Sequence, residues 1–174
     1  MPILNRKAGA AGAVCAVGVI VAIMLSGGQV RTNQRGLELI GNAEGCRREP
    51  YTCPAGIITD GIGNTHGAKP GTRKTDEQIA ADWQQNILDA EACVNRYAAG
   101  ARLPDNTFSA AVSIAFNVGC PKMQKSTMFR YFRYGQLVDG CNEFPRWVFG
   151  GGKELSGLVT RRQEERQLCL KGVK

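Results

Sequence analysis

Apolar residues recur along much of this chain at the three- and four-residue spacing of an amphipathic helix. The longest such stretch follows Thr75 and Gln78, whose spacing matches a capping box, and it predicts a helix over about 76–97. The same pattern predicts a helix over 33–43, which Gly45 would end. Further helical stretches are separated by turns rich in Gly and Pro. They run from Asp105 to a stop at Gly119 and over 128–134, 138–148 and 158–170.

The segment between residues 46 and 71 lacks this helical pattern. It is rich in Gly, Pro, Thr and Asn, and it contains the β-prone run Ile57-Ile58-Thr59. We therefore predict a small β-hairpin lobe between helical parts of the chain. The fold class expected from the whole pattern is α+β, mostly α.

The N-terminal part is different again. Residues 8–30 carry no charge and come after the basic pair Arg6 and Lys7. As a helix, this uncharged stretch would be long enough to span a bilayer. Only seven of the residues between 8 and 25 are Val, Ile or Leu, which gives an insertion free energy of about −2 to −4 kcal/mol. Insertion is therefore marginal.

Three interpretations of this apolar segment follow: a cleavable signal peptide, a permanent anchor and a temporary anchor. Small residues at 26–28 would suit cleavage, but the apolar stretch is longer than that of a typical signal peptide. Its many Ala and Gly residues argue against permanence. We predict a temporary anchor over 1–30, with the basic N-terminus in the cytoplasm, ahead of one domain over 31–174.

Charge and cysteine content bear on the binding partners and on the compartment in which the protein acts. The chain has a formal net charge of +7, of which only Arg6 and Lys7 lie in the first 30 residues. A basic surface suits nucleic acid, anionic lipid or carboxylate-bearing cell wall, or it serves solubility alone. Seven cysteines without paired Cys-x-x-Cys spacing predict an oxidising compartment and no zinc site. Four of them are either small buried residues or two disulfides. These are Cys93, Cys120, Cys141 and Cys169.

Candidate chemistry lies where the first predicted helix meets the hairpin lobe. Glu44 is followed nine residues later by Cys53, and Thr59 comes six residues after that. Cleavage of a glycosidic bond requires a proton donor and, opposite it, a group that attacks or supports an oxocarbenium-like transition state. A carboxylic acid suits the first role, and a thiolate carries the charge and nucleophilicity that the second requires.

This spacing resembles the active-site segment of phage-type lysozymes, the endolysins of glycoside hydrolase family 24, in which Glu, Asp and Thr hold these three places. Here Cys53 stands where the family has Asp. With Cys46 nearby and Cys15 in the apolar segment, the chain resembles the subgroup of signal-anchor-release endolysins with a thiol-controlled catalytic site. The similarity covers about 33–174 and includes the run Gly-Leu-Val-Thr-Arg-Arg at 157–162.

The resemblance implies a two-lobed lysozyme-like fold, with a small β-hairpin lobe, a long inter-lobe helix and a helical C-terminal lobe. It assigns proton donation to Glu44 and the holding of a water to Thr59. Cys53 would act as nucleophile, as base on a water or as an electrostatic stabiliser, and these options differ in stereochemical outcome. Asp60 is the alternative second group. His66 is expected to be a cleft or surface residue.

The same subgroup resemblance implies a switch that uses three thiols. A Cys46–Cys53 disulfide would silence the enzyme by occupying the catalytic sulfur. While Cys15 is in lipid its thiol forms little thiolate, because an apolar environment raises the pKa of a thiol. After release, Cys15 would attack Cys46 and expel Cys53 as a free thiolate.

The expected activity is hydrolysis of the β-1,4 bonds between N-acetylmuramic acid and N-acetylglucosamine in peptidoglycan, with no cofactor and no metal. We expect a monomer that is held at the bacterial inner membrane by its N-terminal segment, is released to the periplasm and does not bind nucleic acid. The alternatives are a lytic transglycosylase and a catalytically inactive wall-binding module. A membrane-tethered nucleic-acid binder has only the basic charge in its favour.

Overall fold

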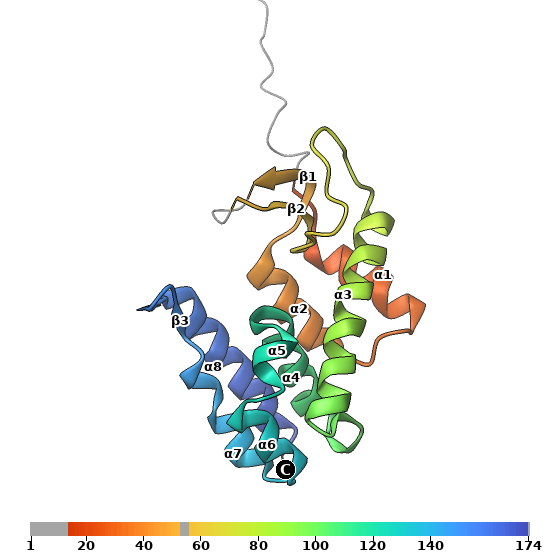
Figure 1. The fold of residues 1–174 in the computed structure, drawn as a ribbon. Coiled ribbons are helices and arrows are strands. Elements are labelled where there is room, and N and C mark those ends of the chain that lie inside the picture. The colour runs from red at the N-terminus through yellow and green to blue at the C-terminus, as the bar shows by residue number, and fades with distance from the viewer. Residues whose placement is uncertain (1–13, 53–55, 174) are drawn as a thin grey trace, which may run out of the picture.

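A computed structural model describes residues 14–52 and 56–173 of the chain. The predicted catalytic Cys53 and the basic pair Arg6 and Lys7 lie outside the described residues. The fold is mostly helical with two small antiparallel sheets, which confirms the α+β class (Figure 1). The helices are α1 (Val17–Gly27), α2 (Gln34–Glu44), α3 (Asp76–Tyr97), α4 (Asp105–Val118), α5 (Cys120–Met123), α6 (Thr127–Arg133), α7 (Leu137–Asn142) and α8 (Ser156–Lys171). Two 3-10 turns, η1 (Gly100–Arg102) and η2 (Phe144–Arg146), join them.

Helix α3 runs the length of the molecule, from the hairpin lobe at one end to the helical lobe at the other (Figure 1). It starts with the predicted capping box, in which the Thr75 hydroxyl accepts from the Gln78 backbone N–H and the Gln78 side chain accepts from Thr75 N–H. Its buried face includes Ile79, Trp83 and Ile87. The long inter-lobe helix is therefore confirmed at the predicted residues.

Helix α2 also agrees with the prediction. Asn33 caps its first turn by accepting a hydrogen bond from Gly36 N–H, and Gly45, with a φ of 75°, ends it directly after Glu44. The predicted helix over 138–148 is wrong. There α7 ends at Asn142 and gives way to η2, because Pro145 cannot donate the backbone bond that a continued helix needs.

The helical C-terminal lobe is built around α4, which packs against α2, α3 and α8. Four phenylalanines in this lobe are at most 2% exposed: Phe108, Phe129, Phe132 and Phe144. Disulfides join Cys93 to Cys120 and Cys141 to Cys169. The sequence left these four cysteines open, and the structure assigns them to two disulfides, one between α3 and α5 and one between α7 and α8.

The β-hairpin lobe contains strands β1 (Arg47–Thr52) and β2 (Ile58–Gly61). They pair antiparallel, with Tyr51 opposite Thr59 and an irregularity between Arg47 and Tyr51. The other sheet pairs β3 (Phe149–Gly150) with β4 (Lys153–Glu154) beside α8. Strand β1 begins three residues after Glu44, so the hairpin lobe lies next to the C-terminal end of α2.

Residues 14–27 are part of the packed fold in this structure. Helix α1 packs on α2 and α3, and buries Ile20, Val21 and Met24. Its close approach depends on Gly41 of α2, where an added Cβ would lie 2.5 Å from Cγ1 of Val17. Ahead of α1 the backbone is extended and Val14 forms an isolated antiparallel bridge with Arg47.

Across 14–52 and 56–173, no helix has both the length and the apolar character that a bilayer crossing requires.

Candidate active site

Glu44 is the last residue of α2 and is held from two sides. Nη1 of Arg161, on α8, lies 2.8 Å from its Oε1. On the hairpin side it meets Gly63, where an added Cβ would lie only 3.4 Å from Oε2. The Glu44 side chain is 24% exposed. Its carboxyl group is thus fixed in position and still reachable by a ligand.

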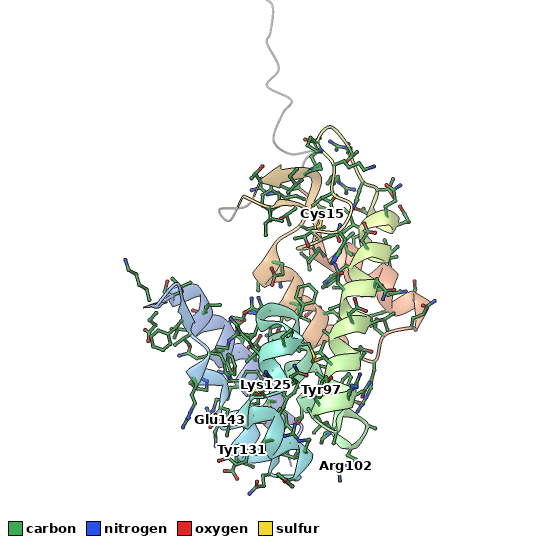
Figure 2. All side chains as sticks on the ribbon, in the orientation of Figure 1. Cys15, Tyr97, Arg102, Lys125, Tyr131 and Glu143 are labelled. Atoms are coloured by element: carbon green, nitrogen blue, oxygen red, sulfur yellow. A yellow bond between two sulfur atoms is a disulfide. The ribbon has the colours of Figure 1, made fainter. Side chains whose placement is uncertain are left out.

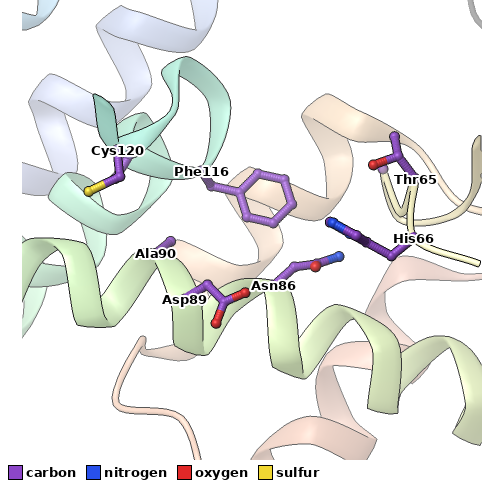
Figure 3. A pocket seen from close by; sticks show the side chains of 9 residues that line it. Thr65, His66, Asn86, Asp89, Ala90, Phe116 and Cys120 are labelled. Atoms are coloured by element: carbon purple, nitrogen blue, oxygen red, sulfur yellow. The ribbon is translucent and has the colours of Figure 1, made fainter. Parts of the chain in front are cut away.

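Glu44 lines one pocket, and its neighbour Gly63 lines a second. A pocket of about 600 Å³ on the α8 side is lined by Glu44, Asn117 and Arg161, among others. A second pocket, of about 260 Å³, is lined by Gly63, the neighbour of Glu44, and by α3 and α4. Figure 3 shows His66, Asn86 and Phe116 around this second space. The larger pocket gives a ligand room beside the acid.

A buried charge network supports Arg161 from behind. Oε1 of Glu165, which is fully buried, accepts from Nε of Arg161 at 3.1 Å and from the Ser113 hydroxyl at 2.6 Å. The other oxygen of Glu165 accepts from Arg162. The two cations, Arg161 and Arg162, are thus balanced by the carboxylates of Glu165 and Glu44. The Arg161 guanidinium is held in place because it bonds to both carboxylates.

Sequence reasoning missed the role of this network. The run at 157–162 was linked to the C-terminal lobe, but no function was given to Arg161. The available signal was the spacing of Arg161 and Arg162 to Glu165, which lies four residues after the first and three after the second on one helix. Such pairs usually lie on exposed helix faces, so the spacing alone did not indicate a buried partner for Glu44.

The other predicted site residues fall as follows. Thr59 lies on β2, is 5% exposed, and its hydroxyl donates to the Ile57 carbonyl at 3.3 Å. Cys53 is not described, so its role and that of Thr59 stay predictions. His66 is exposed and lines the 260 Å³ pocket, as expected of a cleft residue. Asp60 is fully buried and bonded to Lys74 and Asn64, so it is unsuited to act on a substrate in this conformation.

A disulfide joins Cys15 to Cys46, with their Cα atoms 5.2 Å apart. The backbone N–H of Cys15 also donates to the Cys46 carbonyl at 3.3 Å. Cys15, labelled in Figure 2, thereby ties the residues ahead of α1 to the start of the hairpin. This is the bond that the predicted exchange would produce. Since the six described cysteines are paired with one another, none of them is available to bond Cys53.

Comparisons with known proteins agree with this geometry. The family model for phage lysozyme matches residues 41–165. The SAR-endolysin of Escherichia phage P1 is 51% identical over 97% of each chain. The crystal structure of the active form of P1 phage endolysin Lyz matches with a TM-score of 0.91 at 52% identity, covering 94% of this chain and 98% of that one. The secreted inactive form of the same endolysin gives 0.59 at 52% identity, covering 82% and 97%.

Proposed function

This chain belongs to the phage lysozyme family, and we propose that it is an endolysin that lyses its host by cutting peptidoglycan. Its substrate is the β-1,4 bond between N-acetylmuramic acid and N-acetylglucosamine. The observation that carries this proposal is the position of Glu44: it is paired with Arg161, it is partly exposed, and it lines an open pocket of about 600 Å³.

In the proposed reaction, Glu44 gives a proton to the oxygen of the leaving sugar. Cys53 supplies the group opposite, by attacking the anomeric carbon, activating a water or stabilising positive charge. Thr59 helps to hold the water. The short hairpin supports this assignment, because it begins three residues after Glu44 and carries Thr59 on β2.

We further propose that the enzyme is exported in an inactive form, tethered to the inner membrane by residues 1–30 and silenced by a Cys46–Cys53 disulfide. After release to the periplasm, the Cys15 thiolate attacks the Cys46 sulfur. The Cys15–Cys46 bond forms, the old bond breaks, and Cys53 leaves as a thiolate, so no external oxidant is consumed. The Cys15–Cys46 disulfide of this structure supports the final step. The greater similarity to the active than to the inactive form of the P1 endolysin supports it too.

The test is clearance of purified peptidoglycan by wild type and by Glu44→Gln. We expect the substitution to lower the rate by on the order of 10³-fold, because the amide cannot donate the required proton. Glu38→Gln is the matched control, since it removes a carboxylate from the same helix and should leave the rate unchanged. Products with reducing ends identify a hydrolase, whereas anhydro sugars identify a transglycosylase. Clearance by Glu44→Gln at the control rate would reject Glu44 as proton donor.

A further inference from the structure

An ion pair lies behind the turn that carries Gly63. Nζ of Lys74 is 2.8 Å from Oδ1 of Asp60, whose side chain is fully buried. The other oxygen, Oδ2, is also buried and has no hydrogen-bond partner within the described part of the chain. A buried carboxylate is unfavourable unless a cation and hydrogen bonds compensate for its lost hydration. Asp60 therefore depends on Lys74.

Asp60 closes the turn between β2 and the residues that follow. Its backbone N–H and carbonyl both bond to the backbone of Asn64, each at 2.9 Å. The Asn64 side chain donates to Oδ1 of Asp60 at 2.8 Å and to the His66 carbonyl at 2.9 Å. Within this loop Gly61 and Gly63 have φ values of 55° and 65°, which favour glycine. Oδ1 of Asp60, which also binds Lys74, thus holds the side chain that spans this turn.

The turn connects directly to the proposed catalytic groups. Thr59 is the residue before Asp60, and Gly63 lies against the Glu44 carboxyl group. A shift of the turn would move Gly63 relative to Glu44 and would displace the Thr59 hydroxyl. Asp60 itself cannot reach a substrate, because it has no exposed surface.

Lys74 links this turn to two further elements. Its backbone N–H donates to the Arg48 carbonyl on β1 at 2.9 Å. Its Nζ donates to Oδ2 of Asp82, on α3, at 2.6 Å. Helix α3 is long, capped and buried along one face, so it is a rigid reference for the hairpin lobe. Lys74 therefore connects the turn to α3 through its side chain and to β1 through its backbone.

From these contacts we propose that Asp60 and Lys74 are positioning residues of the active site: they hold the turn over 59–64 so that Gly63 keeps its place beside Glu44 and Thr59 keeps its place on β2. The inference rests on the proposed function, since it concerns the same reaction. It predicts that loss of the pair slows the chemical step more than it weakens substrate binding, because Asp60 is fully buried and the Lys74 ammonium is bonded to Asp60 and Asp82.

The experiment measures kcat and KM of Lys74→Met on soluble, sonicated peptidoglycan strands. We expect kcat to fall about 10- to 100-fold, the loss typical of a misplaced catalytic group, with KM within about twofold of wild type. Lys74→Arg keeps the cation and should recover most of the lost kcat. Lys69→Met is the matched control, because it removes the same charge from an exposed position in the same loop.

A second variant covers the case in which Lys74→Met fails to fold. Asp60→Asn combined with Lys74→Met leaves no unpaired charge in the interior, and it should fold with kcat similarly reduced. A folded variant with kcat equal to that of Lys69→Met would overturn the proposal, and so would a loss confined to KM or loss of folding in both variants. If wild type itself releases no sugar product, the proposed function has failed instead, whatever the pair does.

Discussion

The hairpin lobe and the helical lobe are held together by different means. In the described part of 46–74 the buried apolar residues are Cys46 and Ile62. The helical lobe buries a set of phenylalanines and is crossed by two disulfides. The hairpin relies on ion pairs, such as Arg48 with Asp76 and Lys74 with Asp60, and on the Cys15–Cys46 bond.

This difference shows how one chain can be both stable and switchable. Most of the buried apolar side chains lie in the helical part of the chain. The hairpin lobe holds the proposed chemistry but has little apolar area of its own, so we expect its position to depend more on the Cys15–Cys46 disulfide. Stability and control are therefore assigned to separate regions.

The strongest challenge to this division is Cys15→Ser. Without Cys15 the Cys46–Cys53 bond has no internal attacker, so clearance after release should be on the order of 10²-fold slower or worse without reductant. Added reductant should restore it by freeing Cys53. Turbidity of purified walls measures both conditions, and activity equal to wild type without reductant would reject the exchange.

Arg161→Met tests the support that the helical lobe gives to the acid. The variant removes the ion pair to Glu44, while Glu165 keeps Arg162 as a partner. We expect kcat to fall about tenfold or more, because the carboxyl group loses its fixed position. Arg166→Met on the same helix is the control, since Arg166 contacts Asn142 rather than the site. Equal rates for the two variants would mean that Arg161 does not position Glu44.

Removal of a disulfide in the helical lobe should lower stability and leave activity nearly unchanged. The double variant Cys141→Ala and Cys169→Ala is expected to lose about 2 to 4 kcal/mol of unfolding free energy. Its clearance rate at 25 °C should stay close to that of wild type, because the bond joins α7 to α8 away from Glu44. Chemical unfolding and turbidity give the two values. A large loss of activity with little loss of stability would contradict the division between the lobes.

The smallest expected effect concerns pH. Burial lowers the pKa of Lys74, but hydrogen bonds and charges from Asp60 and Asp82 outweigh it and raise that pKa above its ordinary 10.5. The pair should therefore contribute its full stability at pH 9, below the pKa of the unfolded chain, and lose it as pH rises through the folded pKa. The difference in unfolding free energy between wild type and Lys74→Met should shrink at alkaline pH. A constant difference would exclude an ionic contribution.

Much of the fold followed from the sequence because its signals are local. The capping box at Thr75, the glycine after Glu44 and the helical spacing of apolar residues each act within one or two turns. The two disulfides of the helical lobe and the ion pair between Arg161 and Glu44 did not follow, because they join residues 27, 28 and 117 positions apart. Such pairing depends on how helices pack, and residue spacing does not determine it.

At the candidate site, too, the sequence indicated residues that lie close together along the chain but not partners that lie far apart. Glu44 and Thr59 were found because a spacing of fifteen residues is visible in one segment. Asp60 was considered as a catalytic alternative, and only its burial against Lys74 assigns it to structure instead. The predicted helix over 138–148 was too long because the apolar pattern continues past Pro145. A helix cannot continue there, because proline has no backbone N–H to donate.

The extended backbone at Val14 and Cys15 sets a condition on activation. Helix α1 has 11 residues, which corresponds to about 16 Å against the roughly 30 Å of a bilayer core. A segment that crosses lipid must bond its backbone within a helix, so in the tethered form Cys15 would be helical, whereas here it pairs with the hairpin. If residues 1–30 form the proposed tether, the backbone at Cys15 must change from helical to extended before its sulfur can bond Cys46 as it does here.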